Sequence, residues 1–282
     1  MEDSAKKQLD EEKMVNDAFQ HLINTYLASR HRKKVEIITK AFNFAKQAHK
    51  GVRRLSGEPY IMHPLAVAQI VCSEIGLGST SICAALLHDV VEDTDYTVED
   101  VSNIFGPKIA QIVDGLTKIS GGIFGDKASA QAESFKKLLL TMSDDIRVIL
   151  IKISDRLHNM RTLGSQPPNK QYKIAGETLY IYAPLANRLG LNKIKEELER
   201  YSIIRTVTAV ERADVVLMVI DATEGVTEQD AKIAGIAHER GKGVIIVVNK
   251  WDAIEKNDRT MREYESDIRQ VLSYMPYAEI MY

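Results

Sequence analysis

The sequence predicts a mainly α-helical N-terminal part followed by a partial α/β segment. Up to about residue 199, apolar residues recur at helical spacing, and short stretches containing Gly, Pro or Asn separate the predicted helices. From about residue 200, continuous apolar runs such as 215–220 and 244–248 alternate with helical segments, which is typical of buried parallel strands in an α/β layer. We therefore expect one helical domain over 1–199 and an incomplete α/β segment over 200–282.

The overall composition excludes some classes of partner. The chain has 282 residues and a formal net charge of −2, so it has no basic excess of the kind that indicates direct nucleic-acid binding. Cys72 and Cys83 lie in apolar helical segments. We expect them to be buried free thiols, which is typical of proteins in a reducing compartment. Residues 1–13 have no apolar core of a signal peptide, and no apolar run has membrane-spanning length. We expect a cytoplasmic protein without a membrane partner.

The stretch AALLHDVVEDT, residues 84–94, carries the strongest chemical signal. We expect it to form one helix, with His88, Asp89, Glu92 and Asp93 on a shared surface, because residues three and four apart lie on the same face. Its other residues are mostly apolar, which predicts that this helix lies in a core. Buried carboxylates cost free energy unless a cation or a metal compensates them. The stretch therefore predicts a divalent metal site.

Two further segments supply candidate ligands. YIMHPLAVAQIV places His63 at the start of an amphipathic helix, and ILIKISDRLHNMRTL places Asp155 inside another. Together with His88 and Asp89 they make a set of two histidines and two carboxylates, which suits Mn, Fe or Zn better than Ca.

Glu92 and Asp93 lie one turn beyond these ligands, where a carboxylate pair can orient a water molecule and move its proton. Each residue alone is better explained as a core histidine, a helix cap or an ion-pair partner. That explanation fails for the set, because adjacent His and Asp within an apolar run are a poor structural choice without a ligand.

Several sequence blocks resemble the hydrolase domain of the RelA/SpoT homologue family, in order and over about residues 30–199. They are HKGVRRLSGEPYIMHPLAVAQIV, ALLHDVVEDTDYTVEDV, FGPKIAQIVDGLTKI, DRLHNMRTL and YAPLANRLGL. The resemblance implies an HD-type, metal-dependent phosphohydrolase of the stringent response. With Mn²⁺, such an enzyme removes the 3′-pyrophosphate of the guanine nucleotide (p)ppGpp to give GDP or GTP.

Carried over residue by residue, the resemblance assigns each candidate a role. The metal ligands it implies are His63, His88, Asp89 and Asp155, and the catalytic acids are Glu92 and Asp93. The substrate-binding residues it implies are Arg54, Ser56, Asn159 and Thr162. Leu55 stands where many family members have a basic residue, so phosphate attraction depends more on Arg53 and Arg54.

The segment over about 201–282 resembles part of the second GTPase domain of Der (EngA), a ribosome-assembly GTPase. Asn249, Lys250 and Asp252 match its guanine-binding NKxD element, which here follows the apolar run VIIVV. The sequence GxxxxGK[ST], whose backbone amides hold phosphates, does not occur in the chain. We therefore expect a P-loop GTPase-like segment without its phosphate loop, with an exposed sheet edge that favours self-association.

Three functions follow from these observations. The complete set of metal, acid and nucleotide residues favours a Mn²⁺-dependent (p)ppGpp 3′-pyrophosphohydrolase without a synthetase domain. The NKxD element supports a GTP-binding, GTPase-like protein. The third alternative is a catalytically inactive remnant of a fusion between two incomplete proteins.

Overall fold

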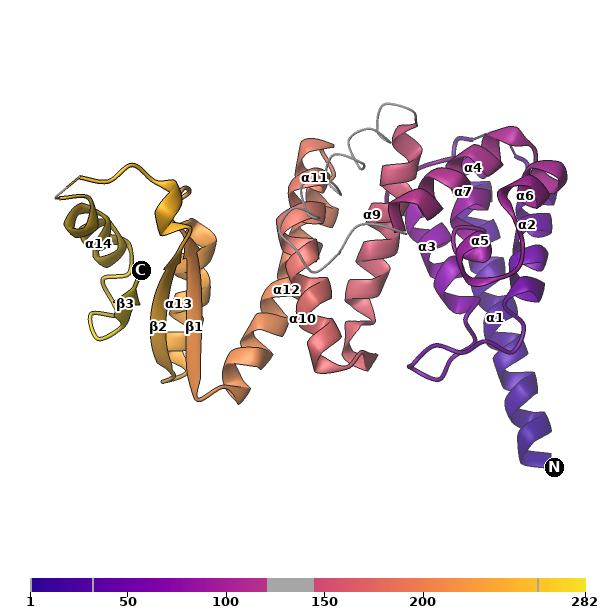
Figure 1. Ribbon diagram of the computed structural model, residues 1–282. Coiled ribbons are helices and arrows are strands. Elements are labelled where there is room, and N and C mark those ends of the chain that lie inside the picture. Colours follow the sequence, from indigo (N-terminus) through magenta and orange to yellow (C-terminus); the bar gives the residue numbers. More distant parts are fainter. Residues whose placement is uncertain (1, 32, 121–144, 258) are drawn as a thin grey trace. The chain divides into compact units, whose positions relative to one another are not determined.

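The computed structural model describes residues 2–31, 33–120, 145–257 and 259–282 (Figure 1). The chain divides into two compact units, unit 1 over Met1–Leu198 and unit 2 over Glu199–Tyr282. The described part of unit 1 is built from helices, whereas unit 2 contains a parallel sheet with helices. None of the described helices has the length and apolar character needed to cross a membrane.

The helices of unit 1 are α1 (Glu2–Ala28), α2 (Val35–Ala48), α3 (Met62–Ser73), α4 (Ser79–Leu86), α5 (Val90–Asp93), α6 (Val98–Phe105), α7 (Pro107–Ser120), α9 (Ile146–Arg161), η1 (Leu163–Ser165), α10 (Pro168–Glu177), η2 (Thr178–Tyr182) and α11 (Ala183–Arg188). Helix α12 (Asn192–Arg212) contains the residues at which one unit ends and the other begins in the sequence. Unit 2 continues with β1 (Val215–Asp221), α13 (Glu228–Glu239), β2 (Gly243–Asn249), η3 (Trp251–Ala253), α14 (Thr260–Val271) and β3 (Glu279–Met281).

Helix α4 lies at the centre of unit 1, where residues 81–86 are all buried. It packs against α2, α3, α7 and α9, and the small side chains of Ala84 and Ala85 allow these helices to approach closely. The N-cap of helix α9 is Asp145, whose carboxylate accepts a hydrogen bond from the Arg147 backbone N–H. This cap sets where α9 starts and therefore which of its residues face α3 and α4.

The expected single helix over residues 84–94 is wrong. Helix α4 ends at Leu86 and α5 starts at Val90, so His88 and Asp89 lie in the turn between them. The His88 ring is buried, and its Nδ1 lies 2.7 Å from the Ala85 carbonyl oxygen. In a continuous helix this carbonyl would accept a backbone hydrogen bond instead. The break satisfies this buried ring locally and turns its other nitrogen into the interior.

Unit 2 has the parallel topology that the sequence predicts. Its sheet has the order β1-β2-β3, and both strand pairs are parallel. Alternate side chains such as Ile220, Ile246 and Val248 are buried in a core that also includes Ile268 of α14 and Ala237 of α13. Because β1 is an edge strand, one side of its backbone has no neighbour within this sheet.

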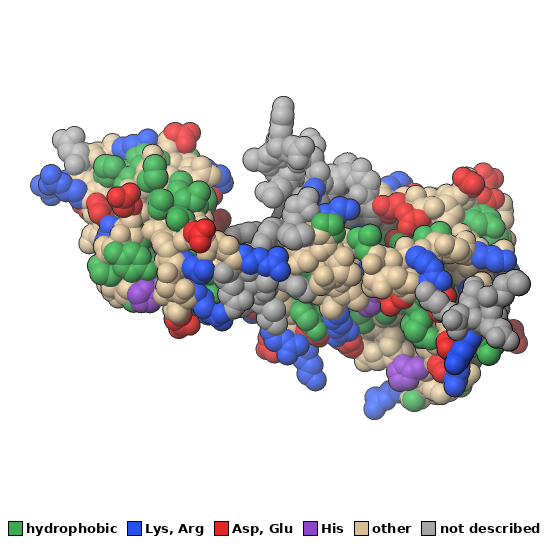
Figure 2. Space-filling view, turned by 90° about the horizontal axis from the view of Figure 1, so that it is seen from below, with side chains coloured by type: hydrophobic (Ala, Val, Ile, Leu, Met, Phe, Trp, Pro, Cys, Tyr) green, Lys and Arg blue, Asp and Glu red, His purple; other side chains and the backbone are tan. Residues whose placement is uncertain are grey.

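The expectation of buried strands is wrong for one face of β1. Val215, Leu217 and Val219 are 53%, 63% and 57% exposed, and they alternate with buried residues along the strand. The register places Leu217 beside Ile245 and Val219 beside Val247, so the exposed residues share one face of the sheet. Hydrophobic side chains accordingly gather at the surface of unit 2 (Figure 2). The continuous apolar run hides this alternation in the sequence.

Candidate metal and nucleotide site

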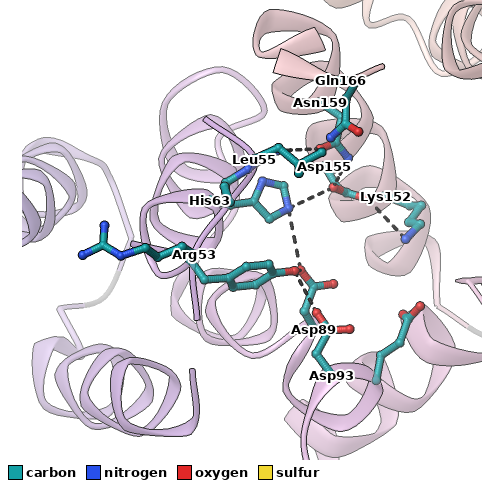
Figure 3. Close-up of a pocket in the computed structure, with 12 residues that line it drawn as sticks. Arg53, Leu55, His63, Asp89, Asp93, Lys152, Asp155, Asn159 and Gln166 are labelled. Atoms are coloured by element: carbon teal, nitrogen blue, oxygen red, sulfur yellow. Dashed lines mark hydrogen bonds and ion pairs between the residues drawn. The ribbon is translucent and has the colours of Figure 1, made fainter. Parts of the chain in front are cut away.

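Unit 1 contains a cavity of about 390 Å³ whose walls come from α3, α5, α9 and the loop before α3 (Figure 3). It is lined by Arg53, Arg54, Leu55, Tyr60, His63, Asp89, Glu92, Asp93, Lys152, Asp155, Asn159 and Gln166. Nearly all of these side chains are polar or charged, and two of them, His63 and Asp155, are buried. Polar groups that converge in one cavity are typical of a binding or catalytic site.

A buried cluster of metal-ligating atoms lies at the base of this cavity. One ligand atom from each of His63, His88 and Asp155 lies within 4.8 Å of the other two. His63 Nε2 is 3.2 Å from Asp155 Oδ1, and His88 Nε2 is 4.0 Å from the same oxygen. The first turn of α3, the turn after α4 and the middle of α9 therefore bring together residues that are far apart in sequence.

The fourth expected ligand, Asp89, borders this cluster. Its Oδ2 lies 3.0 Å from His88 Nε2 and 3.7 Å from His63 Nε2. In Figure 3, His63, Asp89 and Asp155 face one another across the cavity. The four residues expected to bind metal thus lie at one place.

The donor atoms fit a divalent cation. The contact of His88 Nδ1 with the Ala85 carbonyl leaves Nε2 as the ring atom that faces Asp89 and Asp155. This Nε2 is buried and lies 3.0 Å from Asp89 Oδ2, but among the described residues no partner has the geometry of a hydrogen bond to it. An unsatisfied buried polar atom costs free energy, whereas metal-ligating histidines commonly donate the other ring N–H to a carbonyl. A cation beside Nε2 would satisfy this nitrogen.

The electrostatics also favour a cation. Burial disfavours the charged form of His88, but the charges of Asp89 and Asp155 outweigh this effect and raise the pKa to about 9. Burial likewise acts to raise the pKa of Asp155, yet Lys152 and His63 hold it well below its usual range. The acids therefore stay ionised at neutral pH, and a positive charge is favoured among them.

The expected acid pair stands beside the cluster on α5. Glu92 and Asp93 line the cavity and are exposed to it. The Tyr60 hydroxyl lies at hydrogen-bonding distance from Asp89 Oδ2 (2.7 Å) and Asp93 Oδ2 (2.8 Å). Burial and these two acids raise the pKa of Tyr60 above its ordinary value, so the phenol keeps its proton and donates. Tyr60 thus connects a candidate metal ligand to a candidate catalytic acid.

The residues expected to bind nucleotide separate into two groups. Arg54 belongs to the loop before α3, and its side chain contacts the C-terminal end of α9, where the guanidinium donates to Asn159 Oδ1 and Thr162 Oγ1, each at 3.3 Å. Asn159 in turn donates to Asp155 Oδ1 at 2.7 Å, so these residues adjoin the metal cluster. Ser56 is exposed in the loop and is not among the residues that line the cavity.

Comparison with known families agrees with this geometry. The family model described as "HD domain" matches residues 41–192, more than half of the chain. This chain belongs to the HD domain family. A second family model, described as "Elongation factor Tu GTP binding domain", matches residues 202–279.

Two bacterial proteins illustrate the similarity of the chain to curated relatives. The bifunctional (p)ppGpp synthase/hydrolase SpoT of Escherichia coli K12 is 47% identical over 208 residues, which cover 70% of this chain and 29% of that protein. A guanosine-3′,5′-bis(diphosphate) 3′-pyrophosphohydrolase of Vibrio cholerae is 41% identical over 82% of this chain and 34% of its own length. The chain therefore spans about a third of the length of these relatives. A solved structure of a metazoan SpoT ortholog that hydrolyses ppGpp matches with 24% identity and a TM-score of 0.45, covering 64% of this chain and 98% of that one.

Several residues at the HD domain site were not found by sequence reasoning. Lys152 and His158 lie three residues before and after Asp155 on α9, so helical spacing alone could have placed them on the same face. Lys152 Nζ is 3.2 Å from Asp155 Oδ2. Burial, together with His63 and Arg54, lowers the pKa of His158 to about 3, so its ring is neutral. Gln166 follows the end of η1, where no periodic pattern predicts its position.

Two further cations of unit 1, Arg161 and Lys118, pair with acids outside the cavity. Arg161 pairs with Glu74 at 2.9 Å and with Glu197 at 2.7 Å. Lys118 pairs with Asp114 one turn earlier on α7. The Arg161 contacts join α9 to Glu197 of α12 and to Glu74 at the end of α3, whereas the Lys118 contact lies within α7. Neither cation lines the cavity.

Outside the HD domain, the NKxD residues lie at the carboxyl end of β2. Asn249, Lys250 and Asp252 are all exposed. Lys250 has a positive φ of 57°, and its ammonium lies 2.6 Å from Asp221 Oδ2 at the end of β1. Hydrogen bonds from Lys250 and Thr223 lower the pKa of Asp221 to about 2. The parallel strands thus bring residues 221–225 (DATEG) and residues 249–252 (NKWD) to the same edge of the sheet, at the carboxyl ends of β1 and β2.

Proposed function

We propose that the helical domain over 1–199 is a Mn²⁺-dependent (p)ppGpp 3′-pyrophosphohydrolase that produces GDP or GTP. The single observation that carries this proposal is the buried cluster of His63, His88 and Asp155, which adjoins a cavity lined by the acid pair Glu92 and Asp93. The names of the relatives support the choice of substrate.

His63, His88, Asp89 and Asp155 would hold the ion. Two imidazole nitrogens and two carboxylates form a mixed N/O set that suits Mn²⁺. When bound, the ion supplies Lewis acidity that activates water and polarises phosphoryl oxygens. Lys152 beside Asp155 keeps one oxygen of that carboxylate oriented, which leaves Oδ1 toward His63.

Glu92 and Asp93 would handle the protons of the reaction. Hydrolysis breaks the bond between the 3′-oxygen and the pyrophosphate, so one proton leaves the attacking water and one reaches the departing oxygen. A carboxylate that faces the cavity can accept the first of these protons. Tyr60 holds Asp93 in place by a hydrogen bond to Oδ2, which leaves Oδ1 for the water.

Arg54, Asn159, Thr162 and Ser56 would bind the nucleotide. Arg54 presents a permanent positive charge at the cavity wall, and guanidinium groups bind phosphate oxygens in pairs. The hydroxyl and amide groups of the other three residues offer donors and acceptors for ribose and base. Leu55 is 66% exposed at the cavity wall and provides an apolar surface in place of a charge.

The test is release of pyrophosphate from ppGpp by the purified chain, with Mn²⁺ and with EDTA. We expect turnover only with Mn²⁺, and its loss in Asp89→Ala. A chain that binds Mn²⁺ but releases no pyrophosphate would contradict the proposal and favour the inactive remnant.

A second function is favoured by the match of residues 202–279 to a GTP-binding family model. We infer that unit 2 derives from a GTPase domain like the second one of Der and retains weak guanine binding through Asn249, Lys250 and Asp252. Calorimetry with GDP tests this inference, since binding should disappear in Asp252→Ala. Binding that survives this change would refute the assignment.

We also infer that unit 2 associates with copies of itself. The edge strand β1 carries three apolar side chains that are each more than half exposed, and exposed apolar edge strands favour pairing between chains. Light scattering should show association that Leu217→Lys reduces. A wild-type chain that stays monomeric at high concentration would exclude it.

A further inference from the structure

Three side chains of unit 1 form a line of hydrogen bonds that ends at the metal cluster. Arg54 Nη1 lies 3.3 Å from His158 Nδ1, and the same nitrogen lies 2.8 Å from His63 Nδ1. His63 Nε2, on the other side of its ring, faces Asp155 Oδ1 at 3.2 Å. The line therefore runs from the loop before α3, through the last turn of α9, to the first turn of α3.

The arginine decides which nitrogens carry hydrogen. A guanidinium has donors and no acceptor, so the His158 nitrogen that faces it must offer a lone pair. Because His158 Nδ1 is an acceptor, the His63 Nδ1 that contacts it must be the donor. A neutral imidazole carries one hydrogen, so His63 Nε2 is left with a lone pair.

This lone pair faces carboxylate oxygens. His63 Nε2 is 3.2 Å from Asp155 Oδ1 and 3.7 Å from Asp89 Oδ2. A lone pair and an anionic oxygen repel each other, and a cation placed between them turns this repulsion into attraction for both. The hydrogen-bond line thus holds His63 in the form that a divalent cation requires.

We propose that His158 is a positioning residue that fixes the ring orientation and tautomer of His63 for a divalent cation, with Arg54 fixing His158 in turn. The site it serves is the one in the proposed function, so the inference rests on that site binding metal. Arg54 thereby has a task before any nucleotide binds. Asn159 and Thr162 hold its other nitrogen Nη2, which keeps Nη1 directed at His158.

The neighbouring Arg53 provides a matched control. It also lines the cavity, but its guanidinium forms two hydrogen bonds with Glu11, at 2.9 Å and 2.7 Å, and a third with the Gly57 carbonyl. Loss of a positive charge near a cation site should by itself strengthen cation binding. For Arg54 the inference predicts the opposite, namely that removing its charge weakens cation binding.

The first experiment measures the Mn²⁺ dissociation constant of the full chain without nucleotide, using His158→Phe and His158→Asn. Phe keeps a ring but has no acceptor, whereas the Asn carbonyl can accept from His63. We expect His158→Phe to weaken Mn²⁺ binding by roughly 10- to 100-fold, the usual cost of losing a partner of a metal ligand. We expect His158→Asn to keep an affinity close to that of wild type, because the partner of the ligating histidine is retained.

The same measurement on Arg54→Leu and Arg53→Leu tests the origin of the lone pair. We expect weaker Mn²⁺ binding in Arg54→Leu and unchanged or tighter binding in Arg53→Leu. Tighter binding in both would assign Arg54 a purely electrostatic effect and overturn its part in the line. Equal weakening in both His158 variants would assign His158 a packing role and overturn the proposal, as would a wild-type chain that does not bind Mn²⁺.

A second measurement needs no variant that could misfold. Imidazole ¹⁵N chemical shifts of the metal-free wild-type chain report the tautomer of each histidine. We expect hydrogen on Nε2 of His158 and on Nδ1 of His63. Hydrogen on Nδ1 of His158 would refute the inference whether or not the chain hydrolyses ppGpp. If both histidines have the expected tautomers and the chain binds metal but does not hydrolyse ppGpp, the inference stands and only the proposed function is refuted.

Discussion

Both units bring polar residues from separate elements to one place, and among the residues that the structure describes it is unit 1 that buries them. His63, His88 and Asp155 are 4%, 2% and 7% exposed, whereas Asn249, Lys250 and Asp252 in unit 2 belong to the exposed class. Buried acids and imidazoles are costly unless a cation compensates them, while exposed ones are stabilised by water. The comparison indicates that burial of polar residues, more than their number, identifies the ligand-binding site of this chain.

The two units also differ in how completely their elements are covered. Residues 81–86 of α4 are buried on every side by neighbouring helices. In unit 2, one face of β1 packs on the core and the other carries Leu217 and Val219 at the surface. A parallel sheet normally has both faces covered, so unit 2 is the unit whose packing is incomplete in this structure.

The largest effect we expect is on catalysis in unit 1. Asp93→Asn keeps the size of the side chain and its contact with Tyr60 but removes a base, so kcat should fall by roughly 10²- to 10⁴-fold. Mn²⁺ affinity should stay close to that of wild type. Steady-state hydrolysis of ppGpp measures the first quantity and titration the second. Asp95→Asn, the same change at an exposed residue outside the cavity, is the matched control.

An intermediate effect concerns the two faces of β1. Ile220 is fully buried and Leu217 is 63% exposed. Ile220→Ala should therefore destabilise unit 2 by roughly 2–5 kcal/mol, the usual cost of a cavity in a core. Leu217→Ala should change the unfolding free energy by less than about 0.5 kcal/mol, as surface substitutions do. Denaturant unfolding measures both values, and equal losses would show that the exposed face is covered in solution.

The smallest effect is a pH dependence confined to unit 1. His88 has a pKa of about 9 in the folded chain without metal, above its unfolded value of about 6.5. Its protonation therefore stabilises the fold fully below about pH 6.5, and this contribution is lost as the pH rises to about 9. Calorimetry in EDTA should show unit 1 melting at lower temperature across this window.

Saturating Mn²⁺ should abolish that decrease, because the ion competes with the proton for His88. The variant His88→Gln should lack it in EDTA as well. Identical pH profiles with EDTA and with Mn²⁺ would argue against His88 as a metal ligand.

Much of the candidate site follows from sequence spacing. Asp155, Asn159 and Thr162 recur at helical intervals on α9, so one face of that helix could be predicted. Adjacent His88 and Asp89 in an apolar run indicate a buried cation site for the same elementary reason. The parallel strands of unit 2 follow from apolar runs separated by helices.

Other features depend on tertiary contacts that spacing does not encode. The break between α4 and α5 depends on where the buried His88 ring finds an acceptor. The exposed face of β1 depends on which elements cover the sheet, and Leu217 and Ile220 are equally apolar in the sequence. The contact between His158 and His63 joins residues 95 positions apart, so no local pattern indicates it.

The most direct measurement is Mn²⁺-dependent pyrophosphate release from ppGpp by two variants of the full chain, Asp155→Ala in unit 1 and Asp252→Ala in unit 2. We expect the first to lose turnover and Mn²⁺ binding together, and the second to match wild type in both. Turnover that survives Asp155→Ala, or that disappears in Asp252→Ala, would contradict the claim that the chemistry of this chain belongs to the buried cluster of unit 1.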